Sequence, residues 1–330
     1  MLLRLIKNNR IPGILFIVFL LGIVWLNSFI HPDLVEPTHS MPLYRFIFGS
    51  LDGKFPLSVV LGMVFYALIA ILILRFNSIH FLLQDRSYMP ATFFLFILAS
   101  YPYTLHLNPI LVASPFLVLA MLVLVKGDEH RAEPLALFNA TLLLAIGSMF
   151  YLKLIFFIPF LWITASVIRP LKWRGIVNPI LVVVLMAVFY LTWYWVFKDD
   201  VSLFFTMIEE NLHISWGTFR SLPLNVWIII AYISLLIVIT SIYLLSRFQG
   251  RKIIIRKLYI VLFILFLFCL VFYVFISAYS AEVISLMAIP VAYLFSNFFQ
   301  RRRNHWSHEV LLWIWIALIV YMQVSPYINS

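Results

Sequence analysis

Long apolar segments recur along the whole chain, and few polar positions interrupt them. Each segment holds roughly 17 to 22 mostly apolar residues, which is long enough for a helix to cross a hydrocarbon core about 30 Å thick. The eleven segments are residues 11–30, 57–75, 90–105, 109–126, 135–150, 153–169, 175–197, 225–246, 258–278, 282–299 and 309–327. The pattern predicts an all-α fold, a polytopic transmembrane helical bundle that forms a single integral membrane domain over residues 1–330.

Two pairs of these segments are less regular than the others. Several prolines punctuate residues 90–105 and 109–126, and only Tyr151 and Leu152 separate residues 135–150 from 153–169. Either pair could be a re-entrant hairpin, which enters and leaves on the same side of the membrane. The number of crossings is then nine instead of eleven, and in both cases it is odd.

The basic residues are distributed unevenly between the two sides that this topology creates. With a cytoplasmic amino terminus, 18 of the 23 Lys and Arg residues lie in inner segments. The remaining five are Arg45, Lys54, Lys153, Lys198 and Arg220. Because cytoplasmic loops are enriched in Lys and Arg, this distribution predicts the amino terminus inside and the carboxyl terminus outside.

The composition excludes a water-soluble protein. Hydrophobic residues make up 64% of the chain and charged residues 11%, where a soluble domain has about 25% charged residues. The net charge of +10 does not require a nucleic-acid partner, because orientation signals and contacts with anionic membrane lipids explain it. Cys269 is the only cysteine, which excludes an intramolecular disulfide and a site with several thiolate ligands.

Two outer loops are long enough to carry function, residues 31–56 and 198–224. In the second loop, apolar residues between Phe204 and Ile214 stand beside Glu209 and Glu210, which is typical of a helix that lies in the headgroup plane. The segment MPLYRFIFGSL in the first loop has the same character. We therefore expect interfacial helices in both outer loops.

The first outer loop also holds the densest set of groups able to act as general bases or cation ligands. Asp33 and Glu36 lie between His31 and His39, and Asp52 follows. Carboxylates at a membrane surface could activate a hydroxyl, which makes Asp33 and Glu36 the candidate catalytic residues. The alternative is a solvated turn with helix-capping acids. Because Asp-x-x-Glu has no diagnostic ligand spacing, no metal site is predicted, and the sequence points to no particular cofactor.

The predicted spans carry no charge near their midplanes, where a charge is costly. Lys153 and Glu282 come closest, each at the outer end of a short span. Both are candidates for substrate binding or for pairing with each other, and the alternative is that they extend to the interface. The lack of central carboxylates argues against an ion-coupled transporter.

Three stretches carry a resemblance to a known family: NPILVASPFLVLAMLVL, LFNATLLLAIGSMFYLKLIFFIPFLWITASVIRPLKWRGIVNPIL and MAIPVAYLFSNFFQRRRNHWSHEVLLW. Together they resemble an uncharacterised family of multi-pass inner-membrane proteins of the Bacteroidota. The resemblance implies a bacterial inner-membrane location and brings no catalytic residues with it. Some members of that family bear an inherited label of beta-carotene monooxygenase. Carotenoid-cleaving oxygenases are propellers with four iron-binding His, whereas the His here are split between two faces, so the label is a mislabelling.

A second resemblance is architectural. An acidic outer loop after the first span, interfacial helices and many crossings are similar to the C-type glycosyltransferases and polysaccharide polymerases that use polyprenyl-linked sugars. This resemblance implies that Asp33 is the base or a metal ligand and that Arg45 or Arg220 binds a diphosphate. It favours an activity in cell-envelope biogenesis on a lipid-linked saccharide at the outer leaflet. The alternative is a non-catalytic subunit that binds other envelope proteins, or a transporter or flippase.

Overall fold

The computed structural model describes most of the chain: residues 11–30, 41–51, 54–80, 82–83, 87–101, 105–126, 133–171, 173–198, 202–212, 224–276, 283–300 and 305–328. Every regular element within these ranges is helical. The predicted all-α fold is therefore confirmed for the residues that the structure describes.

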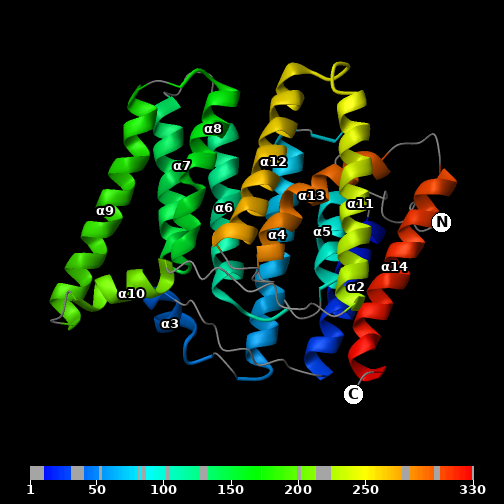
Figure 1. Ribbon diagram of the computed structural model, residues 1–330, viewed down its shortest axis with the longest axis horizontal. Coiled ribbons are helices and arrows are strands. Elements are labelled where there is room, and N and C mark those ends of the chain that lie inside the picture. Colours follow the sequence, from blue (N-terminus) through cyan, green and yellow to red (C-terminus); the bar gives the residue numbers. More distant parts are fainter. Residues whose placement is uncertain are drawn as a thin grey trace.

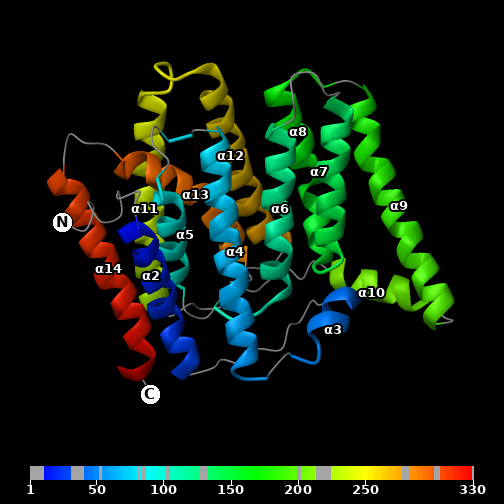
Figure 2. The ribbon, with the colours of Figure 1, turned by 180° about the vertical axis from the view of Figure 1, so that it is seen from behind.

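Most of the helices lie side by side in one layered bundle, and α10 runs across the lower ends of its neighbours (Figures 1 and 2). In chain order the elements are α2 (Ile11–Ile30), α3 (Pro42–Phe48), α4 (Leu57–His80), α5 (Met89–Ala99), α6 (Pro109–Lys126), α7 (Glu133–Ser148), the 3-10 helix η2 (Leu152–Phe157), α8 (Ile158–Ile168), α9 (Trp173–Lys198), α10 (Ser202–Leu212), α11 (Leu224–Ser246), α12 (Ile253–Val271), the π-helical turn η3 (Phe272–Ile276), α13 (Ile284–Phe299) and α14 (His305–Ile328).

Six of the described helices are long and apolar enough to cross a membrane. They comprise residues Leu57–His80, Pro109–Lys126, Trp173–Val196, Leu224–Ser246, Ile253–Phe275 and Trp306–Val324. Shorter apolar helices occupy the other five predicted segments. Each of the eleven apolar segments thus corresponds to a helix, while the number of crossings stays a prediction.

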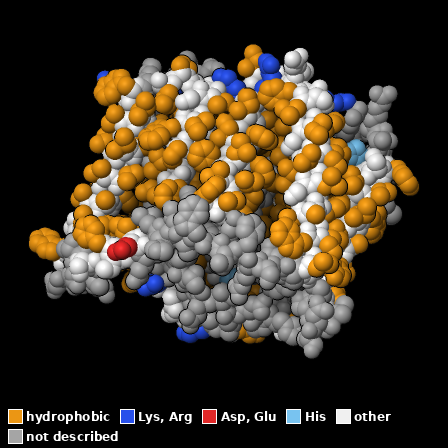
Figure 3. Space-filling view, in the orientation of Figure 1, with side chains coloured by type: hydrophobic (Ala, Val, Ile, Leu, Met, Phe, Trp, Pro, Cys, Tyr) orange, Lys and Arg blue, Asp and Glu red, His pale blue; other side chains and the backbone are white. Residues whose placement is uncertain are grey.

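The outer surface of the bundle is predominantly apolar, as Figure 3 shows for one face. Helix α9 is an example, since Val184, Leu185 and Val188 all project away from the protein. Exposed apolar surface on this scale is unfavourable in water and favourable against acyl chains. The structure therefore has the surface of a membrane protein.

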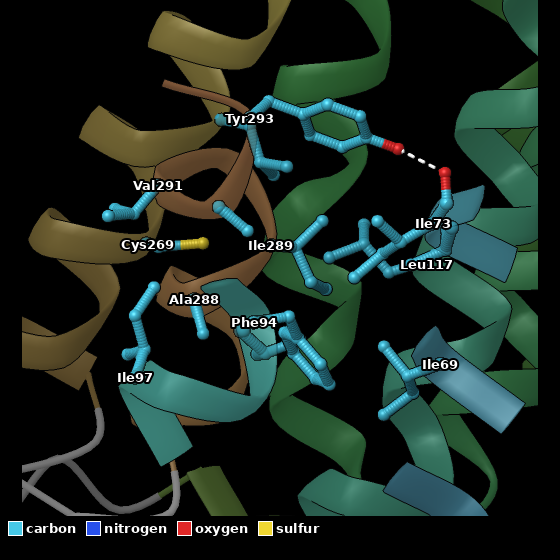
Figure 4. Packing of buried hydrophobic residues seen from close by; sticks show 14 of the residues in the cluster. Ile69, Ile73, Phe94, Ile97, Leu117, Cys269, Ala288, Ile289, Val291 and Tyr293 are labelled. Atoms are coloured by element: carbon cyan, nitrogen blue, oxygen red, sulfur yellow. Dashed lines mark hydrogen bonds between the residues drawn. The ribbon is translucent and has the colours of Figure 1, made fainter. Parts of the chain in front are cut away.

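The centre of the bundle is formed by two short helices, α5 and α13, that pack against each other. All eleven residues of α5 are buried. Figure 4 shows Phe94 of α5 and Ile289 of α13 packed toward Ile69 of α4. In the same view, the Tyr293 hydroxyl donates a hydrogen bond of 2.6 Å to the Ile73 carbonyl oxygen. This bond connects α13 to α4 inside the core.

The connection from α7 to α8 differs from the predicted span that starts at residue 153. Residues Leu152–Phe157 form a 3-10 helix, and α8 begins only at Ile158 with a proline in its first turn. Pro159 lacks an N–H group, so it fits the start of an α-helix better than its interior. Gly147 permits the tight return, because a Cβ atom there would lie 2.6 Å from Cδ2 of Leu154.

Candidate functional site

Two of the six predicted site residues lie in the described part of the chain. Arg45 is on α3, where its side chain is exposed, and Lys153 is in η2, where its side chain is buried. The other four, Asp33, Glu36, Arg220 and Glu282, lie outside the described residues, as do the neighbouring residues His31, His39 and Asp52.

Arg45 and Lys153 belong to elements that meet at one corner of the bundle, beside the lower end of α9 (Figure 1). A small apolar cluster holds this corner together, with Leu152 of η2 packed against it. Its buried members are Met41, which precedes α3, Tyr190 and Tyr194 of α9, and Phe204 of α10. We call Arg45, Lys153, Tyr190, Tyr194 and Phe204 the α10 corner.

The two tyrosines stand one turn apart on the same face of α9. The ring of Phe204 lies 6.0 Å, centroid to centroid, from each of them. The hydroxyl of Tyr190 is buried and has no hydrogen-bond partner among the described residues. A buried hydroxyl in a folded protein is normally paired, because leaving it unpaired costs about 1–3 kcal/mol. Tyr190 therefore offers a donor and an acceptor to a ligand.

Arg45 reaches the corner because α3 is anchored by its apolar residues. Tyr44 is fully buried, and the ring of Phe48 lies 5.9 Å from that of Phe65 on α4. The next side chain, Arg45, is exposed and lies close enough to Tyr194 for an electrostatic interaction. A permanently charged guanidinium is thus held at the edge of the cluster.

Lys153 is more deeply placed than the sequence suggested. Its side chain is 2% exposed, so the ammonium does not extend freely to the surface. Burial of an ammonium is costly unless polar groups or an anion surround it, and such positions are commonly functional. The residue before it, Leu152, packs on the apolar cluster, so the backbone of Lys153 lies beside that cluster.

Helix α10 has one side buried against the protein and one side exposed. Phe204 and Asn211 are buried, whereas Glu209 is exposed together with Phe205. The helix contacts both α9 and η2. Its position in a headgroup plane remains a prediction, as does that of α3.

The chemistry of the α10 corner is that of anion binding. It combines a guanidinium, an ammonium and two phenol hydroxyls, and all of these groups donate hydrogen bonds. Phosphate oxygens accept such bonds strongly when the donor is charged. Within the described ranges no group of three or more His, Cys, Asp or Glu could hold a metal ion, and the absence of a metal site from the whole chain stays a prediction.

Sequence reasoning did not select Tyr190 and Tyr194. They lie in FYLTWYWVF at the end of a predicted span, where aromatic residues are ordinary interface anchors. Their spacing of four residues places both on one face of a helix, but many residue pairs in a helix have this spacing. Only the packing of Phe204 and Met41 against that face distinguishes these two rings from the other aromatic residues of the segment.

Comparison with known proteins identifies the family of this chain. Neither the curated proteins nor the solved structures contain a match. The model of one protein family matches residues 40–328, which includes all four elements of the α10 corner. The chain therefore belongs to the DUF6427 family, a family of unknown function.

Proposed function

We propose that this protein acts in cell-envelope biogenesis on a lipid-linked saccharide at the outer leaflet, in the manner of C-type glycosyltransferases or polysaccharide polymerases. The observation that carries the proposal is that exposed Arg45 and buried Lys153 lie on α3 and η2, two elements that border the same apolar cluster. We assign to this corner the binding of the phosphate groups that join the saccharide to its polyprenyl chain. Asp33 and Glu36, in the loop that precedes α3, are the proposed catalytic residues, and Arg220 and Glu282 complete the substrate site.

The proposal places the chain in the bacterial inner membrane with eleven crossings, the amino terminus inside and the carboxyl terminus outside. The positions of the described cations support this orientation. Lys126, Arg169, Arg174 and Arg247 lie at or beside the helix ends at the upper edge of Figure 1, whereas Arg45 lies at the lower side. The proposed source is a member of the Bacteroidota, and the proposal leaves no role for carotene oxygenation. A periplasm-active reporter fused after Ser330 should be active, and an inactive fusion would overturn the odd number of crossings.

The role of the corner is tested by binding of a polyprenyl phosphate to the purified full chain. We expect Lys153→Met to lower the affinity at least tenfold, because a charged donor to phosphate is lost. Arg45→Gln should have a similar effect. Lys54→Gln is the matched control, since Lys54 is exposed near the start of α4. Equal affinities in all four proteins would refute the assignment.

The catalytic residues need a separate test. In a deletion strain, the double variant Asp33→Asn and Glu36→Gln should fail to restore the wild-type phenotype at normal expression. Full complementation would show that the two carboxylates are not required for the activity. It would leave the phosphate-binding role of the α10 corner untouched.

A second candidate function is a non-catalytic membrane-complex subunit, or a transporter or flippase. It is favoured by helix α9, which lies at one side of the bundle and is only weakly covered by the rest of the protein. A helix so weakly covered has room for a neighbouring envelope protein on its apolar face. Stable co-purification of one partner, lost on substitution of Val184 and Val188 by larger residues, would support this function.

A further inference from the structure

A second group of polar side chains lies at the opposite end of the bundle, in the turn between α11 and α12. The segment RFQGRKIIIRK, residues 247–257, contains five basic residues and no acidic residue. We call these residues the basic turn. It lies at the upper edge of Figure 1, where Figure 3 shows Lys and Arg side chains at the surface.

Two of the five cations donate hydrogen bonds to neighbouring helices. The guanidinium of Arg251 lies 4.9 Å above the ring of Tyr259 and donates a hydrogen bond to Oδ1 of Asn297. The ammonium of Lys257 donates a hydrogen bond of 2.8 Å to the carbonyl oxygen of Ile168 at the end of α8. These contacts fix the turn against α8 and α13.

Asn297 has a donor that no described residue pairs. Its side chain is 7% exposed, and its Nδ2 atom is buried without a hydrogen-bond partner in the described part of the chain. The orientation of the amide is determined, because a guanidinium only donates and Oδ1 must therefore face Arg251. An N–H donor is thus left beside a cation, and both groups require an acceptor oxygen, preferably an anionic one.

The remaining cations of the turn are available to the same ligand. Arg247 stacks over Tyr243 at 5.3 Å, which leaves its charge near the turn. Neither Lys252 nor Arg256 forms an ion pair with a described acidic residue.

Apolar side chains stand directly beside these charges. Ile253 and Ile254 are each 66% exposed and follow Lys252 in the first turn of α12. An anion that is free in water gains nothing from them. A phospholipid does, because its acyl chains cover the isoleucines while its phosphate meets the cations.

From this combination we infer that the basic turn is a binding site for the phosphate headgroup of an anionic phospholipid. The phosphate oxygens accept hydrogen bonds from Asn297 Nδ2 and Arg251, with Lys252 and Arg256 as further cations. This site is separate from the α10 corner, so the failure of either assignment leaves the other standing.

The test uses the full chain in nanodiscs made of phosphatidylcholine with a titrated fraction of phosphatidylglycerol, and it measures bound phosphatidylglycerol by native mass spectrometry. We expect the double variant Lys252→Gln and Arg256→Gln to lower the affinity about 30-fold, since each basic residue near an anionic surface contributes about a factor of five. The control is Arg174→Gln, which removes an exposed cation at the start of α9. A loss as large in the control would overturn the site.

Asn297→Asp separates a binding role from a structural one. Aspartate keeps an acceptor for Arg251, so the fold is preserved, but it replaces the free donor by an anionic oxygen that repels phosphate. We expect unchanged thermal stability in phosphatidylcholine and at least tenfold weaker phosphatidylglycerol binding. Wild-type affinity in this variant would refute the site. Equal competition by inorganic phosphate at the same concentration would refute the lipid as the ligand.

Discussion

Trp315 of α14 provides the most quantitative test of how the bundle is held together. Its side chain is fully buried, and its Nε1 atom donates a hydrogen bond of 3.0 Å to Oγ of Ser100, at the end of α5. Four aromatic rings surround it at centroid distances of 5.3 to 6.4 Å, and they belong to Phe93, Phe96, Tyr232 and Phe295. This one residue therefore connects α14 to α5, α11 and α13.

The hydrogen bond and the ring contribute separable amounts. Trp315→Phe keeps an aromatic ring and removes the donor, and Ser100 still donates to the Phe96 carbonyl at 2.9 Å. We expect a loss of about 1 kcal/mol of unfolding free energy for this change, a typical value for an interhelical hydrogen bond in a membrane protein. Ser100→Ala leaves the indole N–H buried without an acceptor and should cost about 1–3 kcal/mol. Trp315→Ala should cost about 3–5 kcal/mol, because it leaves a large cavity.

A double-mutant cycle isolates the bond. Unfolding free energies of the wild type, Trp315→Phe, Ser100→Ala and the double variant are measured by denaturation in detergent micelles. We expect a coupling energy of about 0.6 to 1.7 kcal/mol between the two positions. A coupling energy below about 0.3 kcal/mol lies within the usual additivity error. It would show that the Trp315–Ser100 hydrogen bond does not hold α14 against α5.

Two further predictions concern packing at other points of the bundle. Tyr293→Phe removes the 2.6 Å hydrogen bond to the Ile73 carbonyl and should lower the unfolding free energy by about 1 kcal/mol in the same assay, so an unchanged stability would contradict the bond. Gly147→Ala places a Cβ atom 2.6 Å from Cδ2 of Leu154 and should destabilise the fold by about 1–3 kcal/mol. The double variant with Leu154→Ala should lose less stability than the two single variants together, and a purely additive loss would refute steric conflict as the cause.

The sequence was sufficient to predict the helices, because each one carries an apolar signal. All eleven predicted apolar segments correspond to helices, and helices also occupy the segments at Pro42–Phe48 and Ser202–Leu212. The helix boundaries were less predictable where the first turns of a helix contain charged residues. Helix α12 begins at Ile253 rather than at residue 258, since Lys257 is accommodated by its hydrogen bond to Ile168. An apolar pattern alone contains no information about such a partner from another helix.

The same limit applies to the two polar sites. Lys153 is recognisable in the sequence as a charge at the edge of an apolar run, but its burial follows from the 3-10 turn and from the close approach at Gly147. Asn297 gives no sequence signal at all. Its importance arises from Arg251, which is 46 residues away in the chain and adjacent only through helix packing.

We assign to the α10 corner the binding of a phosphate group of a lipid-linked saccharide. The most direct measurement is native mass spectrometry of the full chain purified from its own membrane, with the retained lipids identified. We predict a polyprenyl-linked saccharide or polyprenyl phosphate bound to the wild type and to Lys54→Gln, and its loss from Lys153→Met at unchanged thermal stability. The same retained lipids in Lys153→Met and in the wild type would contradict the claim, as would bulk phospholipid alone in the wild type.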